Sequence, residues 1–193
     1  MAEAFELLVA LPKESSPGRG QPVVAGKYLE APTMFNKAGI RELHGLMHER
    51  VDLLLRHVLT VPDRLLREPV SGFGHPSVWK QLLHILSCEE GWVHDLQYKA
   101  FAGWREEDVA TMPALQATKG RIREATRVYL DSLSEAELNT TLAKPPQDWG
   151  GELRSPAFIL LHVITHAFHH KGQIVAMLRI LGYPAPDTDL QAV

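Results

Sequence analysis

The chain has 193 residues, of which 45% are hydrophobic and 22% charged, and its formal net charge is −3. This length and composition are typical of a single globular domain rather than a disordered or fibrous chain. The charge balance provides no general cationic field for nucleic acid, so no nucleic-acid partner is expected. A single cysteine, Cys88, excludes an intramolecular disulfide and a zinc site with two thiolates from one chain.

Residues 1–33 show no sustained hydrophobic period, and the run Ser-Ser-Pro-Gly-Arg-Gly at 15–20 is typical of a flexible connection. We therefore expect an irregular N-terminal arm over 1–33 and one domain over 34–193. The first residues lack the positive charge of a signal peptide. No stretch reaches the roughly 20 uninterrupted apolar residues of a membrane span. The sequence thus predicts a cytoplasmic protein with no membrane partner.

Four segments after the arm carry apolar residues at every third or fourth position, which indicates amphipathic helices. They cover about 36–61, 77–103, 111–133 and 155–182. The fourth has Ser155 as N-cap, Pro156 at its first position and Gly182 at its end. Ser134 begins a capping box for a short helical turn, and residues 139–155 are expected to form a loop. With no alternating strand pattern, the fold class predicted is an all-α bundle of four helices.

Histidines are unusually placed in this chain. Ten histidines scattered at random would give about half a pair four residues apart, whereas the sequence has three such pairs, His44/His48, His162/His166 and His166/His170. Residues four apart lie above one another on a helix, so two imidazoles can reach one cation. His166 and His170 also fall in the apolar stripe of the fourth helix. We interpret them as two ligands of a metal ion, the alternative being core histidines bonded to polar groups.

A catalytic zinc-type site has three protein ligands and one open position. Four residues are candidates for the third ligand: His84 in the second helix, His44 or His48 in the first, and a carboxylate such as Glu89. Helical periodicity alone does not choose between them.

Two segments carry a family resemblance. Residues 84–92, HILSCEEGW, and 161–174, LHVITHAFHHKGQI, resemble the DinB/YfiT-like superfamily of small bacterial metal-binding four-helix bundles, over about 36–182. The second segment is close to the family's H-x-x-x-H-R-G-Q pattern, with Lys171 in place of arginine, which keeps the charge but loses the planar fork. The resemblance implies an up-down-down-up bundle, a homodimer, and a divalent metal ion held by His84, His166 and His170.

Several residues are expected around this site. His44 stays the competing third ligand, and Glu89 is a nearby carboxylate. Lys171 either anchors an anion or extends into solvent, and Gln173 either orients a ligand or pairs with a neighbouring helix. His162 and His169 flank the predicted ligands, whereas Cys88 is interpreted as a packing residue and His57, His75 and His94 as surface or loop residues.

The predicted function is that of a metal-dependent enzyme with a small-molecule substrate. Nickel or zinc is the expected ion, with iron or manganese as alternatives. Such an ion activates water for hydrolysis or holds a thiol as thiolate. The resemblance includes S-transferases and isomerases that use low-molecular-weight thiols, which favours the second reaction. The alternatives are a non-catalytic metal-binding protein with a stress-related or interaction role, and a metal-free bundle.

Overall fold

The computed structural model describes residues 35–142 and 154–191. Within these ranges the structure is helical and has no strand, so the predicted fold class is confirmed. The helices are α1 (Lys37–Val58), α2 (Asp63–Arg67), α3 (Val78–Leu96), the 3-10 helix η1 (Glu106–Val109), α4 (Met112–Ser132), α5 (Glu135–Asn139) and α6 (Pro156–Ile180). The expected arm over 1–33 and most of the expected loop at 139–155 lie outside the described residues.

Capping residues set the starts of the four long helices. The side chains of Asn36, Ser77, Thr111 and Ser155 each accept a hydrogen bond from the backbone N–H three residues on, which satisfies one free donor at the helix start. Ser134 and Glu137 form the predicted capping box of α5. Helix α3 is shorter than expected, because it ends at Leu96 rather than near residue 103.

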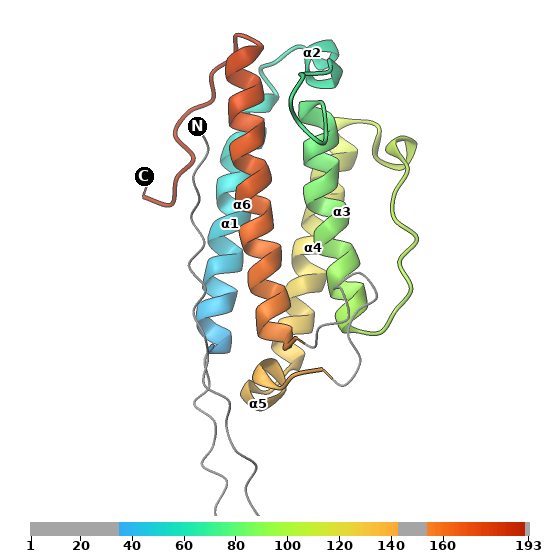
Figure 1. Ribbon diagram of the computed structural model, residues 1–193, viewed down its shortest axis with the longest axis vertical. Coiled ribbons are helices and arrows are strands. Elements are labelled where there is room, and N and C mark those ends of the chain that lie inside the picture. The colour runs from blue at the N-terminus through green and yellow to red at the C-terminus, as the bar shows by residue number, and fades with distance from the viewer. Residues whose placement is uncertain (1–34, 143–153, 192–193) are drawn as a thin grey trace, which may run out of the picture. The chain divides into compact units, whose positions relative to one another are not determined.

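The order of helix directions is up-down-down-up, as the resemblance implied. Figure 1 shows α1 and α6 running in one direction and α3 and α4 in the other, with the connection between α3 and α4 returning along the side of the bundle. Helix α3 has 19 residues, or about 28 Å of axis. The connection covers residues 97–111, and a chain of that length can span up to about 50 Å when extended. It therefore has enough length to join two parallel helices.

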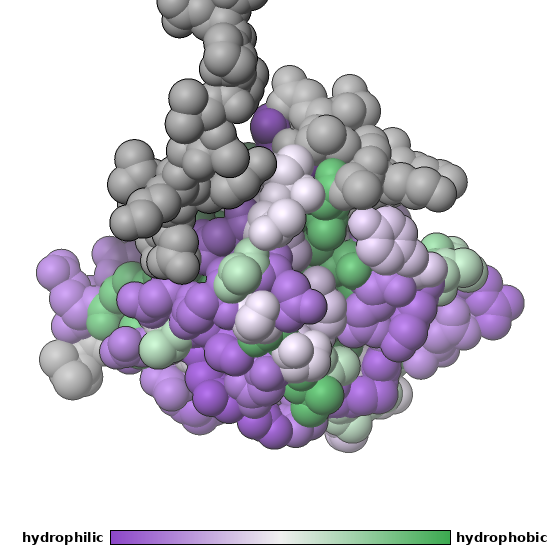
Figure 2. All heavy atoms as spheres, turned by 90° about the horizontal axis from the view of Figure 1, so that it is seen from below, coloured by the Kyte–Doolittle hydropathy of each residue, from purple (hydrophilic) through white to green (hydrophobic). Residues whose placement is uncertain are grey.

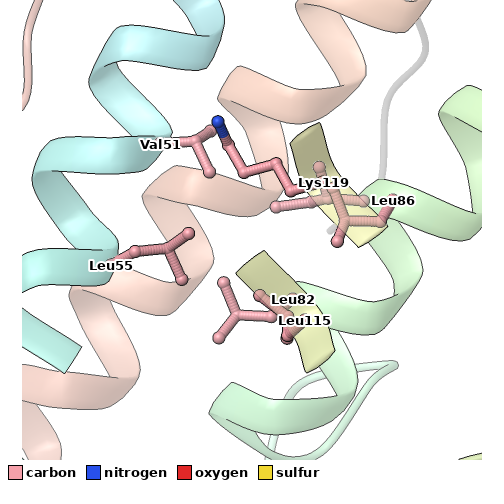
Figure 3. A pocket seen from close by; sticks show the side chains of 7 residues that line it. Val51, Leu55, Leu82, Leu86, Leu115 and Lys119 are labelled. Atoms are coloured by element: carbon pink, nitrogen blue, oxygen red, sulfur yellow. The ribbon is translucent and has the colours of Figure 1, made fainter. Parts of the chain in front are cut away.

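The core lies between the long helices. Figure 3 shows one part of it, where side chains of α1, α3 and α4 point toward one another: Val51, Leu55, Leu82, Leu86, Leu115 and Lys119. Burying each leucine contributes roughly 1.5–3 kcal/mol. Lys119 is only 4% exposed and packs its methylene groups here, while its Nζ lies 2.8 Å from Asp52 Oδ1. The charge of this lysine is thus paired.

The end of the bundle near α5 is mainly hydrophilic. In Figure 2 the visible described side chains on this face are mostly polar, and hydrophobic side chains form only small separate areas. None of the helices in the described ranges is long and apolar enough to cross a membrane.

Candidate metal centre

Three imidazoles from α3 and α6 meet inside the bundle. His166 Nε2 lies 3.2 Å from His84 Nε2 and 3.0 Å from His170 Nε2. His170 is buried, and the other two are half-buried. The core-facing stripe of α6 places His166 and His170 one turn apart, and the packing of α3 against α6 brings His84 to them. All three ligands that the resemblance implied are therefore in contact.

Hydrogen bonds alone do not explain this contact. One imidazole nitrogen either donates a single proton or accepts through a single lone pair, yet His166 Nε2 faces two other Nε2 atoms. Ligands placed tetrahedrally around a zinc-type ion, at about 2.0–2.1 Å from it, lie about 3.3 Å from one another. The observed separations of 3.0 and 3.2 Å are close to this value. The three nitrogens therefore fit a divalent cation bound between them.

The protonation of the three residues also suits a cation. Burial, and secondarily the neighbouring imidazoles, lower the pKa of His84 to about 4, that of His170 to about 4 and that of His166 to about 3. All three are therefore neutral at pH 7, the form in which imidazole binds metal. No proton has to be displaced before an ion binds at that pH.

Gln81 holds His170 in the orientation that a metal ligand needs, and the sequence did not point to it. This side chain is fully buried on α3, and its Oε1 accepts a hydrogen bond from His170 Nδ1 at 2.6 Å. Its Nε2 donates to the backbone oxygen of His75 at 2.9 Å and to Gln173 Oε1 at 2.7 Å. The proton of His170 is thus fixed on Nδ1, which leaves Nε2 with a free lone pair. Gln173 pairs with a neighbouring helix, one of its two expected roles.

Cys88 lies beside His84 and is not a reactive thiolate. Its Sγ is 3.4 Å from His84 Nδ1. Burial raises the pKa of the Cys88 thiol to about 11, so it is a neutral thiol at pH 7. This agrees with its interpretation as a packing residue.

A small pocket adjoins the three imidazoles. It has a volume of about 180 Å³. Two of its wall residues touch the imidazoles: Cys88 contacts His84, and the Trp92 ring packs edge-on against His166 with ring centroids 4.7 Å apart. Its lining residues are Ser87, Cys88, Gly91, Trp92, Asp95 and Phe101. A molecule of a few heavy atoms would fit there, next to the candidate metal centre.

His44 and Glu89 do not lie with these three imidazoles. The structure places them with His48 in a second buried group, where His44 Nε2 and His48 Nε2 lie 2.8 and 3.2 Å from Glu89 Oε1. The competing third ligand, His44, therefore belongs elsewhere, and His84 is the residue that contacts His166.

The expectations for Lys171 were wrong. Its side chain is buried, and Nζ donates to the backbone oxygen of Thr188 at 2.6 Å, so it neither extends into solvent nor faces the imidazoles as an anion anchor. The cause is the segment after α6, which folds back over the helix and supplies the acceptor.

The remaining histidines differ in their contacts. His162 packs against Trp92 with ring centroids 4.5 Å apart, and His169 Nε2 contacts Gln173 Nε2 at 2.8 Å. His75, interpreted above as a surface or loop residue, stacks on His84 with centroids 3.8 Å apart. No spacing in the sequence links this loop histidine to α3.

Sequence comparisons with known proteins agree with the resemblance. Residues 34–193 match the DinB family. The chain is 27% identical to Protein DinB of Bacillus subtilis (strain 168) over 120 residues, which cover 59% of this chain and 70% of that protein. A crystal structure of a DinB family member from Shewanella denitrificans is similar, with 16% identity, a TM-score of 0.49, and coverage of 82% of this chain and 90% of that one. Because the family match covers most of the sequence, the chain belongs to the DinB family.

Proposed function

We propose that this protein is a metal-dependent enzyme in which His84, His166 and His170 hold one divalent cation, nickel or zinc before iron or manganese. The observation that carries the proposal is the convergence of three neutral imidazole nitrogens at 3.0 and 3.2 Å. Three protein ligands leave a position open for a substrate atom or water. When bound, such a cation lowers the pKa of water to about 7 or holds a thiol as thiolate.

The residues around the site favour thiol transfer or isomerisation over hydrolysis. A carboxylate beside the ion is one common general base for hydrolysis. Glu89 is bonded to His44 and His48, and Glu90 is bonded to Arg121 at 2.5 Å. Asp95 lines the pocket, but it follows His84 by about 16 Å along the helix axis. A low-molecular-weight thiol is therefore the proposed co-substrate, and the pocket beside Trp92 its proposed binding place.

A non-catalytic role is the second candidate, because the ligands come from only two helices, α3 and α6. In that role the cation would fasten the two helices together. Removing the ion would then unfold the bundle, whereas in an enzyme it would mainly abolish activity.

The first experiment measures the metal content of protein purified without a histidine tag. The variants His166→Ala and His170→Ala should each lose one equivalent of divalent ion relative to the wild type. His94→Ala is the matched control, because His94 is on α3 but contacts the backbone oxygen of Ala100 and the ring of Phe101 rather than the three imidazoles. Unchanged metal content in both α6 variants would refute the proposal.

A second experiment separates the two roles. Low-molecular-weight thiols are added to the metal-loaded protein, and the midpoint of thermal unfolding is measured. A ligand of the open position should raise the midpoint. No shift with any thiol, together with unfolding when the metal is removed, would favour the non-catalytic role. Sedimentation velocity of the same samples tests the homodimer, which stays a prediction.

A further inference from the structure

A second group of metal-ligating side chains is buried between α1, α3 and α4, apart from the centre described above. It consists of His44 and His48 on α1 and Glu89 on α3. Their exposed fractions are 6%, 1% and 1%. His44 Nε2 lies 2.8 Å and His48 Nε2 3.2 Å from Glu89 Oε1, and the two nitrogens are 3.1 Å apart. Three potential ligand atoms therefore face a common point.

The hydrogen bonds of this group are unevenly distributed. Glu89 Oε1 is approached by both imidazoles and by the hydroxyl of Thr126, which donates to it at 2.8 Å. The other carboxylate oxygen, Oε2, is buried and has no hydrogen-bond partner among the described residues, and the same is true of His48 Nδ1. A buried acceptor without a partner costs roughly 1–3 kcal/mol. If both imidazoles donated to Oε1, their N–H groups would also be forced close together.

The buried carboxylate of Glu89 needs a counter-charge other than Lys119. Lys119 is the cation that faces both Glu89 and His48, but its Nζ is paired with Asp52 at 2.8 Å. Figure 3 shows the amine of Lys119 beside Val51, on the α1 side of the core. The negative charge of the buried Glu89 carboxylate is therefore balanced either by a proton on one of the two imidazoles or by a bound cation. A buried charge of this kind is stable only with a counter-charge.

We propose that His44, His48 and Glu89 form a second site for a divalent cation, of the zinc type. Two histidines and one glutamate are a ligand set that zinc uses in proteins. The separations of 2.8–3.2 Å between the three atoms are near the about 3.3 Å expected between ligands of a tetrahedral ion. A cation would balance the charge of Glu89 and would also account for the approach of two imidazole nitrogens to one oxygen. This inference does not depend on the centre at His84.

A pocket adjoins this site on the side of α1 and α4. His44 forms part of the wall of a pocket of about 200 Å³. The other wall residues are Arg41, Gly45, Arg123, Arg127 and Leu130. Two of the three arginines are paired with Asp131, at 2.6 Å for Arg41 and 2.8 Å for Arg127. Arg127 also pairs with Glu124 at 2.6 Å, so two carboxylates offset part of the positive charge of the three arginines in this pocket beside His44.

The test isolates the second site by removing the first. Metal-depleted His166→Ala/His170→Ala protein is titrated with Co²⁺, and bound Co²⁺ is measured by elemental analysis and by its visible absorption. We expect one equivalent of Co²⁺ in this double variant and two in the wild type. Adding Glu89→Gln, which keeps the shape of the side chain, should abolish the remaining equivalent. Adding Glu90→Gln instead is the matched control, since it removes the neighbouring carboxylate of the same helix and should change nothing.

Three outcomes decide the matter. If the double variant binds no Co²⁺, or if Glu89→Gln leaves its Co²⁺ binding intact, the second site is refuted and the group holds a proton instead. If the double variant binds as much Co²⁺ as the wild type, the proposal for the first centre fails while the second stands. If circular dichroism shows that Glu89→Gln does not fold, His44→Asn provides the same test at the edge of the group. We expect His44→Asn to lose one equivalent of Co²⁺, and no loss would refute the second site.

Discussion

Replacing Gln81 with leucine tests the link between buried hydrogen bonds and metal binding. The change keeps the size of the side chain but removes three hydrogen bonds, to His170 Nδ1, the His75 carbonyl and Gln173 Oε1. The buried N–H of His170 loses its acceptor, which costs roughly 1–3 kcal/mol, and the other two bonds contribute about 1 kcal/mol or less each because their partners reach water. The metal-free variant should therefore lose about 2–4 kcal/mol in the free energy of unfolding.

Metal affinity should fall as well. Removing the hydrogen-bond partner of a metal-bound histidine typically lowers metal affinity 10–100-fold, which corresponds to about 1.4–2.7 kcal/mol. Urea unfolding with a chelator present gives the first quantity, and competition with a zinc indicator gives the second. Gln81→Glu keeps an acceptor for His170 and should retain more affinity than Gln81→Leu, although its buried charge lowers stability. Gln116→Leu, an exposed position on α4, is the control. Affinity equal to wild type in Gln81→Leu would refute the assigned role of Gln81.

Three further predictions concern pH, packing and the C-terminal segment. Because burial lowers the pKa of the three clustered imidazoles from 6.5 to about 3–4, unfolding takes up protons below pH 6.5, so the metal-free protein should lose stability as pH falls from 6.5 to 4. The drop in urea midpoint from pH 7.5 to pH 4.5 should be smaller in His166→Asn than in the wild type. Equal drops would contradict the lowered pKa of His166. Trp79→Ala should lower the free energy of unfolding by about 3–5 kcal/mol because Trp79 is 0% exposed, whereas Val128→Ala at a 54% exposed position should change it by under about 0.5 kcal/mol. Lys171→Met removes the bond to Thr188 and should speed amide exchange in residues 183–191, measured by mass spectrometry, while unchanged exchange would show that this bond does not hold the segment.

The long helices could be predicted because their signals are local. Each of the four long helices begins at a residue that caps it through a hydrogen bond from a backbone N–H three residues on: Asn36, Ser77, Thr111 and Ser155. A few adjacent residues therefore determine where each helix starts. Helices α2 and η1 have five and four residues, too few to show a hydrophobic period. They were not predicted.

The candidate site could be predicted only in part. The spacing of His166 and His170 is a property of one helix, but the choice between His84 and His44 depends on which helix packs against α6, and periodicity carries no such information. The family resemblance supplied it. Gln81 and Lys171 show the same limit, because their partners are His170 and Thr188, which lie 89 and 17 residues away. The path of the irregular segment after α6 has no periodic signal at all.

The separation of His84 and His166 by 82 residues also bears on when the ion enters. At the usual 5–20 residues per second of protein synthesis, His166 is made about 4–16 seconds after His84. A growing chain therefore has at most one of the three imidazoles for most of its time on the ribosome. It cannot use this group to choose between ions until the last helix has emerged, so the choice is made by the metals available where the finished chain folds.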